Sequence, residues 1–523
     1  MARRLTTFSK FLITVAIVAV VFFLGRYFLN NTEMGQDLVE QSQTETGTSS
    51  DNVNTSPSSG KKDDGVVRIG VVTWGGYAGG QYFNEGFAAS EKSRFYKDYG
   101  MKVEFKILDD FEASRAAWKN DEVNLLWATI DAFPTEAGAL AQYDPVVVFQ
   151  ADWSRGGDAV VVRRGITKVS DLKGKKIAVA ELTPSHSFLI WLLQAGGLTP
   201  SDVEIIPQAN AIDAAQAFKS KAVDAAVVWS PDDEDCVNSV PGARILESTR
   251  SASHIIADVF IAKKAYVERN KRKMMDLYEG WMKGAAEINS DDAAKRKAAK
   301  ILAEAFDGFD ETMTYNAISN VRLCTHGDNL DFFAINQDYK GVTGEELYSN
   351  MTNVYTGLGY IKDKVPNWRL IRYPDMVRSN SSLTGSTHAA EGQKVFASAK
   401  KSDETKAAIA TKAVSISFRT AEFQLDENAK YIIDKEFVDI AKSFANSRIR
   451  VEGNTDNVGN KASNKRLSLK RAQSVVNYLI DEHGMPRNRF IVVGNGPDKP
   501  VAPNNTEDGR SKNRRTDFEL VPD

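Results

Sequence analysis

Between residues 67 and 231, short apolar runs alternate with stretches suited to helices, and this alternation restricts the fold more than any other feature of the sequence. The apolar runs have the length and residue types of buried strands. They lie at or within residues 67–73, 101–108, 125–129, 159–162, 170–180 and 222–231. Strands separated by helices predict a parallel sheet with helices on its faces. We therefore expect an α/β fold for this part of the chain.

Ligands of such sheets bind beyond the carboxyl ends of the strands, and aromatic and polar residues occupy these positions here. Trp74 and Tyr77 lie in a glycine-rich loop after the first strand, which favours exposure. Trp127 and Trp229 lie at strand ends, where an aromatic side chain either contacts a ligand or belongs to the core. The candidate solute-binding residues are Trp74, Tyr77, Trp127, Thr129, Asp131, Thr183, Ser185, Trp229 and Asp232.

Two opposing features bear on the charge of the ligand. Thr183 and Pro184 begin a predicted helix, and free backbone N–H groups at a helix start favour an anion. Asp232 begins an acidic run, 232–235, which is either solvated surface or one face of the cleft. In the second case the cleft would favour a cation, which aromatic faces also attract. The sequence supports both alternatives.

A second folded region begins near residue 413. Strand-like runs and two amphipathic helices follow one another there in the order β-α-β-α-β-β, which predicts a compact α+β domain. The strands are expected at residues 414–418, 448–456, 490–494 and 516–520, and the helices from residue 425 and over 464–479.

The amino terminus predicts export from the cytoplasm. We interpret residues 1–10, which are basic, as a cytoplasmic n-region and the apolar run 11–29 as a signal anchor or transmembrane helix in the bacterial inner membrane. The alternative for this run is a cleaved signal peptide, although no small-residue cleavage site follows it. The polar stretch 30–66 is interpreted as a disordered linker, and a second polar stretch, 376–412, as a linker between the folded regions.

Composition and motifs argue against several functional classes. The formal net charge of -3 gives no general basic face for nucleic acid. Five scattered histidines and two cysteines form no ligand cluster, so we expect neither a metal nor a cofactor. Cys236 and Cys324 either pair or stay free. Nucleophile-elbow, phosphate-loop and His-Glu-x-x-His motifs are missing from the sequence, so we expect no enzyme.

Three segments of the middle region resemble periplasmic solute-binding proteins of ABC importers, in particular the nitrate, sulfonate, taurine and thiamine-precursor group. These segments are 170–179, the Thr183-Pro-Ser-His turn, and 222–229. The resemblance covers residues 67–375 and implies a two-lobed α/β periplasmic-binding-protein fold that encloses a small solute. It places lobe one at 67–150 and 258–375 and lobe two at 151–257.

Three motifs of the last region occur in the order typical of the OmpA carboxyl-terminal family, which residues 413–523 resemble closely. They are Glu452-Gly-Asn-Thr-Asp456, Asn464-x-x-Leu-Ser-x-x-Arg-Ala472 and Gly509-Arg-Ser-Lys-Asn-Arg-Arg515. The resemblance implies non-covalent binding of peptidoglycan through the diaminopimelate of its stem peptide, with Asp456 and Arg471 as the key pair. A carboxylate beside a guanidinium would complement the ammonium and carboxylate of that residue.

The same resemblance implies supporting roles for neighbouring residues. Asn454 stands where the family often has histidine, and it retains hydrogen-bonding capacity. The alternative for Asp456 and Arg471 is an internal salt bridge. The candidate peptidoglycan-binding residues are Asp456, Arg471, Thr455, Asn454, Asn464 and Arg515, with Arg514 as a less favoured alternative to Arg515.

Together these features predict an inner-membrane anchor, a tether, a solute-binding domain and a wall-binding domain. The first hypothesis is a periplasmic protein that captures a small solute for an ABC permease or a signalling partner while it is bound to peptidoglycan. The second is a structural envelope linker whose solute-binding fold serves as a protein-interaction module. The identity of the solute and the oligomeric state do not follow from the sequence.

Overall fold

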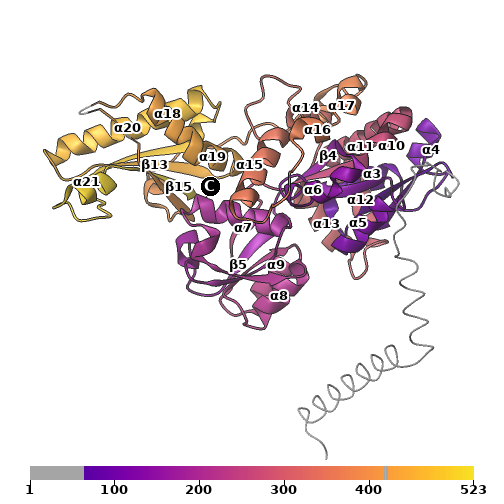
Figure 1. Cartoon of the computed structure of the whole chain (residues 1–523), viewed down its shortest axis with the longest axis horizontal. Coiled ribbons are helices and arrows are strands. Elements are labelled where there is room, and N and C mark those ends of the chain that lie inside the picture. The colour runs from indigo at the N-terminus through magenta and orange to yellow at the C-terminus, as the bar shows by residue number, and fades with distance from the viewer. Residues whose placement is uncertain (1–63, 417, 420–421, 523) are drawn as a thin grey trace, which may run out of the picture. The chain divides into compact units, whose positions relative to one another are not determined.

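The structure is a computed structural model that describes residues 64–416, 418–419 and 422–522. The predicted n-region 1–10, the anchor 11–29 and nearly all of the linker 30–66 lie outside the described residues. Among the residues that are described, no helix combines the length and the apolar character needed to cross a membrane. From Gly65 onward the chain forms one compact unit that contains three β-sheets (Figure 1).

Lobe one is built on a six-stranded sheet with the strand order β11–β4–β10–β3–β1–β2. β1 runs parallel to β2 and β3, whereas β10 runs antiparallel to β3 and β4. β10 has this direction because it returns from lobe two and enters the sheet at the end where β4 leaves it. The prediction of a parallel sheet is therefore wrong in part. The strands are β1 (Val66–Val71), β2 (Lys102–Ile107), β3 (Leu125–Thr129), β4 (Pro145–Ser154), β10 (Ala257–Lys263) and β11 (Val321–Leu323).

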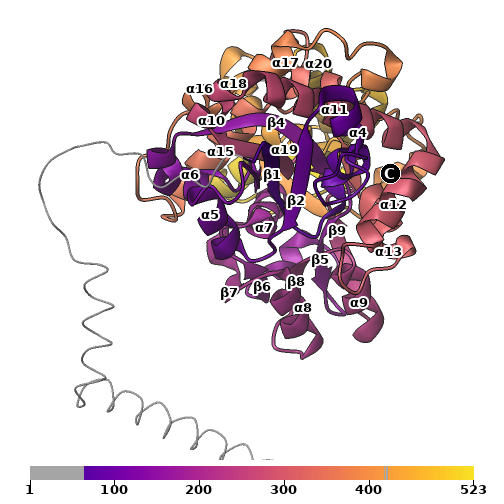
Figure 2. The ribbon, with the colours of Figure 1, turned by 90° about the vertical axis from the view of Figure 1, so that its right-hand side faces the viewer.

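Lobe two is a five-stranded sheet between helices, with the order β7–β6–β8–β5–β9. Alternate residues of β6 face opposite sides: Ala178 packs with α8, and Ile177 packs with the core around α7. Figure 2 shows α8 and α9 on one side of this sheet. The strands are β5 (Asp158–Val162), β6 (Lys176–Ala180), β7 (Glu204–Gln208), β8 (Ala225–Trp229) and β9 (Arg244–Ser248), and the helices are α7 (Pro184–Ala195), α8 (Ala211–Lys219) and α9 (Asp232–Ser239).

The two sheets confirm the predicted two-lobed α/β architecture. The chain crosses between them twice, at residues 155–157 and 249–256. The first crossing begins after Ser154 because β4 continues to that residue, past the lobe boundary predicted at residue 150. Cys236 and Cys324, whose pairing the sequence did not decide, are both free and buried.

The core of lobe one is organised around α11 (Lys271–Ser290) and its fully buried Trp281. The Trp281 ring lies 4.8 Å from the ring of Phe260 and 5.2 Å from that of Phe149, centroid to centroid. α3 (Ala78–Phe83) approaches α11 closely, since a Cβ atom on Gly80 would lie 2.3 Å from the Trp281 ring. Glycine at this position therefore allows α3 to carry the loop before it into the interlobe region.

The other helices of lobe one cover the faces and edges of its sheet. They are α4 (Arg94–Tyr99), α5 (Phe111–Lys119), α6 (Pro134–Leu140), α10 (Lys264–Arg269), α12 (Asp292–Ala303), α13 (Glu311–Ser319), α14 (His326–Phe332), α15 (Gly344–Gly357), α16 (Trp368–Ile371) and α17 (Asp375–Ser379).

The carboxyl-terminal domain has a four-stranded sheet with the order β12–β15–β13–β14. Its first strand lies at 410–414, four residues before the predicted position, because pairing with β15 fixes the register there. A short helix, α21, joins the predicted elements. The elements are β12 (Ala410–Val414), α18 (Glu427–Ile433), a π-helical turn (Asp434–Val438), α19 (Asp439–Ser443), β13 (Arg448–Asn454), α20 (Lys461–Asp481), β14 (Phe490–Gly496), α21 (Glu507–Asn513) and β15 (Thr516–Val521).

The segment 376–412, predicted as a polar linker, packs on both folded regions. Near its start, the hydroxyl of Thr325 in lobe one donates to the backbone oxygen of Ala389 at 2.9 Å. Further on, Phe396 is buried, and the guanidinium of Arg448 lies 5.5 Å from its ring centroid. Arg450 donates a 2.7 Å hydrogen bond to the backbone oxygen of Lys406, and residues 410–412 already belong to β12.

Candidate functional site

The two lobes enclose a narrow cavity lined by aromatic rings and carboxylates. Trp74 precedes the 3-10 turn Gly75–Tyr77, and Trp127 and Thr129 lie at the end of β3 in lobe one. Trp229 ends β8 in lobe two. The structure thus brings five of the nine predicted solute-binding residues together. The lining residues are Val72, Trp74, Tyr77, Trp127, Thr129, Asp158, Pro184, Trp229, Ile256 and Asp258.

The other four predicted residues lie beside the cavity or away from it. Thr183 lines an adjoining groove, and Ser185 accepts a 2.9 Å hydrogen bond from Nε1 of Trp229. Asp131 is fully buried next to the cavity wall, where it accepts a long hydrogen bond (3.4 Å) from the backbone N–H of Ala257. Asp232 begins α9 and is not among the residues that line the cavity. The acidic run therefore does not bring Asp232 into the cavity.

Hydrogen bonds and close contacts fix the rings that line the cavity. The hydroxyl of Tyr77 donates to Oδ1 of Asp258 at 2.6 Å. Nε1 of Trp74 lies 3.4 Å from Oδ1 of Asp152. The indole also packs on the crossing segment 155–157, since a Cβ atom on Gly157 would lie 2.2 Å from its Cη2. Glycine at residue 157 is thus what lets the two lobes close around Trp74.

Four buried aspartates surround this cavity, and the sequence identified only Asp131 among them. Asp152 and Asp258 are paired neighbours on β4 and β10, so their carboxyl groups are close. Burial raises the pKa of Asp131 to about 7, that of Asp158 to about 7 and that of Asp152 to about 8. Burial, and then the charge of Asp152, raise the pKa of Asp258 well above its ordinary range. The cavity wall is thus a group of carboxyls that share a desolvated space.

Two of these carboxyls have unused oxygens. Oδ2 of Asp131 and Oδ2 of Asp152 are buried and have no hydrogen-bond partner among the described residues. Such groups are costly unless something else supplies a proton or a positive charge. A sequence signal for Asp152, Asp158 and Asp258 existed, because each is a carboxylate within or next to an otherwise apolar strand.

The start of α7, which the sequence suggested as an anion site, has little free donor capacity. α7 begins at Pro184 after Thr183, as predicted. Pro184 has no N–H group, and the backbone N–H groups of His186 and Ser187 donate to the oxygen of Thr183 at 3.0 and 3.2 Å. Burial lowers the pKa of His186 to about 4, so this side chain is neutral at pH 7. The geometry here does not favour an anion.

A wider groove adjoins the cavity and shares Trp127, Thr129 and Pro184 with it. Arg115 lies at this groove, with its guanidinium 4.7 Å from a ring centroid of Trp127. Its Nε and Nη2 each donate a 2.8 Å hydrogen bond to the carboxylate of Glu136. The positive charge of Arg115 is therefore already balanced, and the groove gives the cavity a route to its surroundings.

The two crossing segments are tied together by hydroxyl groups. Ser154 donates to Oδ2 of Asp158 at 2.7 Å, and its hydroxyl lies 2.8 Å from that of Thr249. The Thr249 hydroxyl also accepts from the backbone N–H of Gly156 at 2.8 Å. A cavity residue, Asp158, is thus part of the network that sets the angle between the lobes.

In the carboxyl-terminal domain, the predicted pair Asp456 and Arg471 lies at one site, but no direct hydrogen bond between them is found among the described residues. Oδ2 of Asp456 accepts from Nη1 of Arg514 at 2.7 Å. Arg471 donates to the backbone oxygens of Glu422 and Arg419 at 3.0 and 3.3 Å. Burial lowers the pKa of Arg471, and the charge of Asp456 opposes this change. The alternative of an internal salt bridge is thus realised by Arg514, not by Arg471.

The supporting residues of this site have structural partners. Arg515 is buried against Asp517, with 2.9 Å between Nη2 and Oδ2, so it does not reach Asp456. Asn454 is buried and also donates to Asp517, at 2.9 Å. Asn464 donates to the backbone oxygen of Val458 at 3.0 Å and so holds the loop after Asp456. Thr455, the residue before Asp456, donates from its hydroxyl to the backbone oxygen of Asp456 at 2.8 Å.

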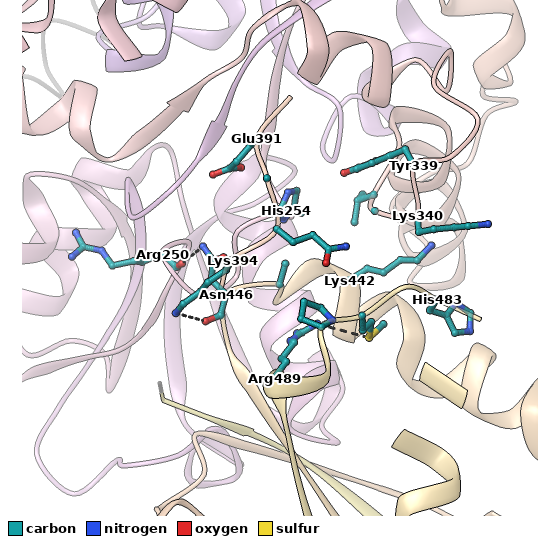
Figure 3. Close-up of a pocket in the computed structure, with 17 residues that line it drawn as sticks. Arg250, His254, Tyr339, Lys340, Glu391, Lys394, Lys442, Asn446, His483 and Arg489 are labelled. Atoms are coloured by element: carbon teal, nitrogen blue, oxygen red, sulfur yellow. Dashed lines mark hydrogen bonds between the residues drawn. The ribbon is translucent and has the colours of Figure 1, made fainter. Parts of the chain in front are cut away.

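Another cavity lies where lobe one, a crossing segment and the carboxyl-terminal domain meet (Figure 3). The guanidinium of Arg489 is buried there. Its N–H groups donate at 2.7–2.8 Å to the backbone oxygens of Ala441, Phe444 and Ser447. Because these carbonyls use its donors, we assign Arg489 a structural role. Labelled residues of this cavity include Arg250, His254, Tyr339, Glu391, Lys394, Lys442 and Arg489.

Two segments of the chain match two different families. Residues 82–293 match the family model described as NMT1/THI5 like, and residues 417–514 match that of the OmpA family. Both resemblances drawn from the sequence motifs are thereby confirmed.

Relatives and solved structures of similar proteins divide in the same way. Outer membrane porin F of Pseudomonas aeruginosa is 36% identical over 107 residues, which cover 20% of this chain and 30% of that protein. Peptidoglycan-binding protein ArfA of Mycobacterium bovis is 37% identical over 90 residues, which cover 17% of this chain and 27% of that protein. The chain thus spans less than a third of these curated relatives. The structure of the periplasmic aliphatic sulphonate binding protein SsuA of Escherichia coli gives a TM-score of 0.47 at 18% identity, covering 60% of this chain and 99% of that one. The structure of desulfurization enzyme DSZB gives a TM-score of 0.42 at 14% identity, covering 60% of this chain and 98% of that one.

Proposed function

We propose that this chain is a solute-binding protein of the bacterial cell envelope that is tethered non-covalently to peptidoglycan. In this proposal the two lobes capture a small solute in the periplasm, and the carboxyl-terminal domain holds the protein to the wall. The observation that carries it is the enclosed interlobe cavity, to which both lobes and a crossing segment contribute side chains. Lobe closure in such folds traps a ligand without chemistry, so the proposal contains no catalytic step.

The wall-binding part of the proposal rests on one constellation. Asp456 and Arg514 form a half-buried ion pair, and the charge of Asp456 opposes the lowering that burial causes in the pKa of the nearby Arg471. An amino acid that carries an ammonium and a carboxylate on one carbon can bind both signs of charge at once. The ammonium would pair with Asp456, and the carboxylate with Arg471. Relatives of this domain include proteins named as outer-membrane and peptidoglycan-binding, which supports an envelope location.

The proposal also assigns residues 11–29 to a single inner-membrane span with the remainder of the chain in the periplasm. Its support is the basic start and the apolar run of the sequence. An ABC permease or a signalling partner would then receive the solute.

Peptidoglycan pull-down of the full chain in detergent tests the wall-binding part. Asp456→Ala and Arg471→Ala are expected to reduce the bound fraction at least tenfold. Matched controls are Asp498→Ala and Arg466→Ala, which change the same residue types on the surface of the same domain. Undiminished pull-down by both site variants would overturn the assignment.

A ligand screen of the same chain by thermal melting tests the solute-binding part, because a ligand that binds only the folded state must raise the melting temperature. No shift with any member of a broad metabolite panel would contradict solute binding. That result would favour the alternative, an envelope linker whose lobes contact a protein.

A further inference from the structure

The interlobe cavity combines rings on several sides with carboxylates and only balanced cations. Trp74, Tyr77, Trp127 and Trp229 line it together with Asp158 and Asp258. Ring faces attract positive charge, and a desolvated carboxylate attracts it more strongly. This combination of side chains suits an organic cation.

Two positive charges lie near the cavity wall. Arg115 is bound by both carboxylate oxygens of Glu136, and Arg155 pairs with Glu391. Nε and Nη1 of Arg155 are buried without a partner among the described residues, and the charge of Arg155 opposes the rise that burial causes in the pKa of Asp152. The hydroxyl and indole donors of Tyr77 and Trp74 each reach one aspartate, and neither brings a positive charge. Asp158 and Asp258, which line the cavity, form no ion pair with a cation among the described residues.

A metal ion does not fit this surrounding. Among the described residues, no group of three or more His, Cys, Asp or Glu side chains converges as metal ligands do. Beyond the carboxyls, the lining adds the hydroxyls of Thr129 and Tyr77, of which the Tyr77 hydroxyl already donates to Asp258. An anion does not fit either, because the cavity wall is acidic and the backbone N–H groups of His186 and Ser187 at the start of α7 are already used.

We propose that a substituted ammonium group binds at this cavity, with the rest of the solute in the adjoining groove that shares Trp127, Thr129 and Pro184. The cavity has about 20 Å³ of free space and the groove about 880 Å³, so the lobes must part to admit the ammonium. This inference rests on the proposed solute-binding function and assigns its ligand class. It places the cation between the Trp and Tyr rings, next to the carboxylates of Asp158 and Asp258. A sulfonate or nitrate in the same position would meet like charge wherever these carboxyls are ionised.

Calorimetric titration of the full chain in detergent tests this assignment, with four small probes. Tetramethylammonium and butylammonium represent the cation class, ethanesulfonate represents the anion class, and calcium represents the metal alternative. We expect both ammonium probes to bind and to raise the melting temperature, and ethanesulfonate and calcium to do neither.

Variants connect binding to this cavity. Asp258→Asn is expected to weaken tetramethylammonium binding at least tenfold, and Trp229→Leu several-fold. Asp276→Asn is the matched control, because Asp276 is a buried aspartate of the same lobe as Asp258 that does not line the cavity, and its replacement should leave binding unchanged. Thermal melting of each variant without ligand shows whether it folds. If Asp258→Asn does not fold, Trp229→Leu, which keeps an apolar side chain, tests the site in its place.

Binding is also expected to weaken about tenfold between pH 8 and pH 5, because protons then compete for the carboxyls. The groups that face the cavity or its wall are Asp131, Asp152, Asp158, Asp258, Tyr77, and the paired Arg115–Glu136 and Arg155–Glu391.

The outcomes separate the ligand class from the function. Binding of ethanesulfonate that Trp229→Leu abolishes, without binding of either ammonium probe, would overturn the cation assignment and leave solute binding intact. Calcium binding that Asp258→Asn abolishes would also overturn it, in favour of a metal site. Failure of these probes together with a negative metabolite panel would overturn both proposals. Equal ammonium binding by the parent chain and Asp258→Asn would place the ammonium elsewhere and would refute this inference.

Discussion

The buried carboxyl of Asp131 predicts how the stability of the two-lobed region depends on pH. This side chain is fully buried, and burial raises its pKa from an ordinary 3.8 to about 7. The folded chain therefore holds a proton that the unfolded chain releases above about pH 4. The stability conferred by this proton is present in full below that pH and is lost as the pH rises through 7. The difference between the two pKa values corresponds to about 4 kcal/mol.

Asp131→Asn removes this dependence while it preserves the shape of the side chain and one acceptor oxygen. We expect the variant to match the parent chain near pH 4.5 and to exceed it by up to about 4 kcal/mol at pH 8.5. Urea unfolding followed by tryptophan fluorescence measures this difference. All eight tryptophans lie between Trp74 and Trp368, so the signal reports on the two-lobed region and not on the carboxyl-terminal domain.

Asp213→Asn is the control for this experiment, because Asp213 is exposed in α8 and its loss should not alter the pH profile. Parallel stability curves for the parent chain and Asp131→Asn across pH 4.5–8.5 would refute the reasoning. They would mean that the carboxyl of Asp131 keeps an ordinary pKa despite its burial.

Three further substitutions test the packing around the site. Trp281→Ala removes a fully buried indole and should cost the two-lobed region about 3–5 kcal/mol in urea unfolding. Gly157→Val would place a Cβ atom 2.2 Å from Cη2 of Trp74, so the lobes should no longer close. Any ligand-induced rise in melting temperature should then be lost, while peptidoglycan pull-down should be unchanged. Lys442→Ala removes a partly exposed 3.0 Å pair with Glu346, and we expect a stability change of at most about 1 kcal/mol by far-ultraviolet circular dichroism.

Local patterns in the sequence predicted most strands of the carboxyl-terminal domain and about half of those of the two-lobed region, but few of the helices of lobe one. The helix expected over 464–479 is α20, and the strand at 125–129 is β3. β12 lies four residues before its predicted position because pairing with β15, and not the alternation of residues 414–418, fixes where the strand lies. The antiparallel direction of β10 could not be predicted either, since it depends on the return of the chain from lobe two.

Site residues were predictable where the residue type and its place after a strand together indicate that the side chain lies at the cavity. Aromatic residues after a strand, such as Trp74, do so, whereas Asp152 and Asp258 acquire their role only when β4 and β10 pair. Arg515 was preferred over Arg514 as a source of positive charge at this site, and the structure pairs Arg514 with Asp456 and Arg515 with Asp517. Adjacent residues of an extended backbone face opposite sides, and the register of β15 turns Arg515 inward.

The docking of the carboxyl-terminal domain bears on how the cavity opens. The oxygen of Ile409 accepts from the N–H of Val169 in lobe two at 2.8 Å, and Asp439 accepts from Asn350 in lobe one at 3.0 Å. The oxygen of Ser443 accepts from the N–H of His254 in a crossing segment, also at 3.0 Å. A rotation of one lobe against the other must therefore break contacts to this domain on at least one side. Because ligand exchange needs such a rotation, the free energy of docking adds to the free energy of opening. In the proposed function, binding of this domain to the wall would thus lie on the same energetic balance as the capture of the solute.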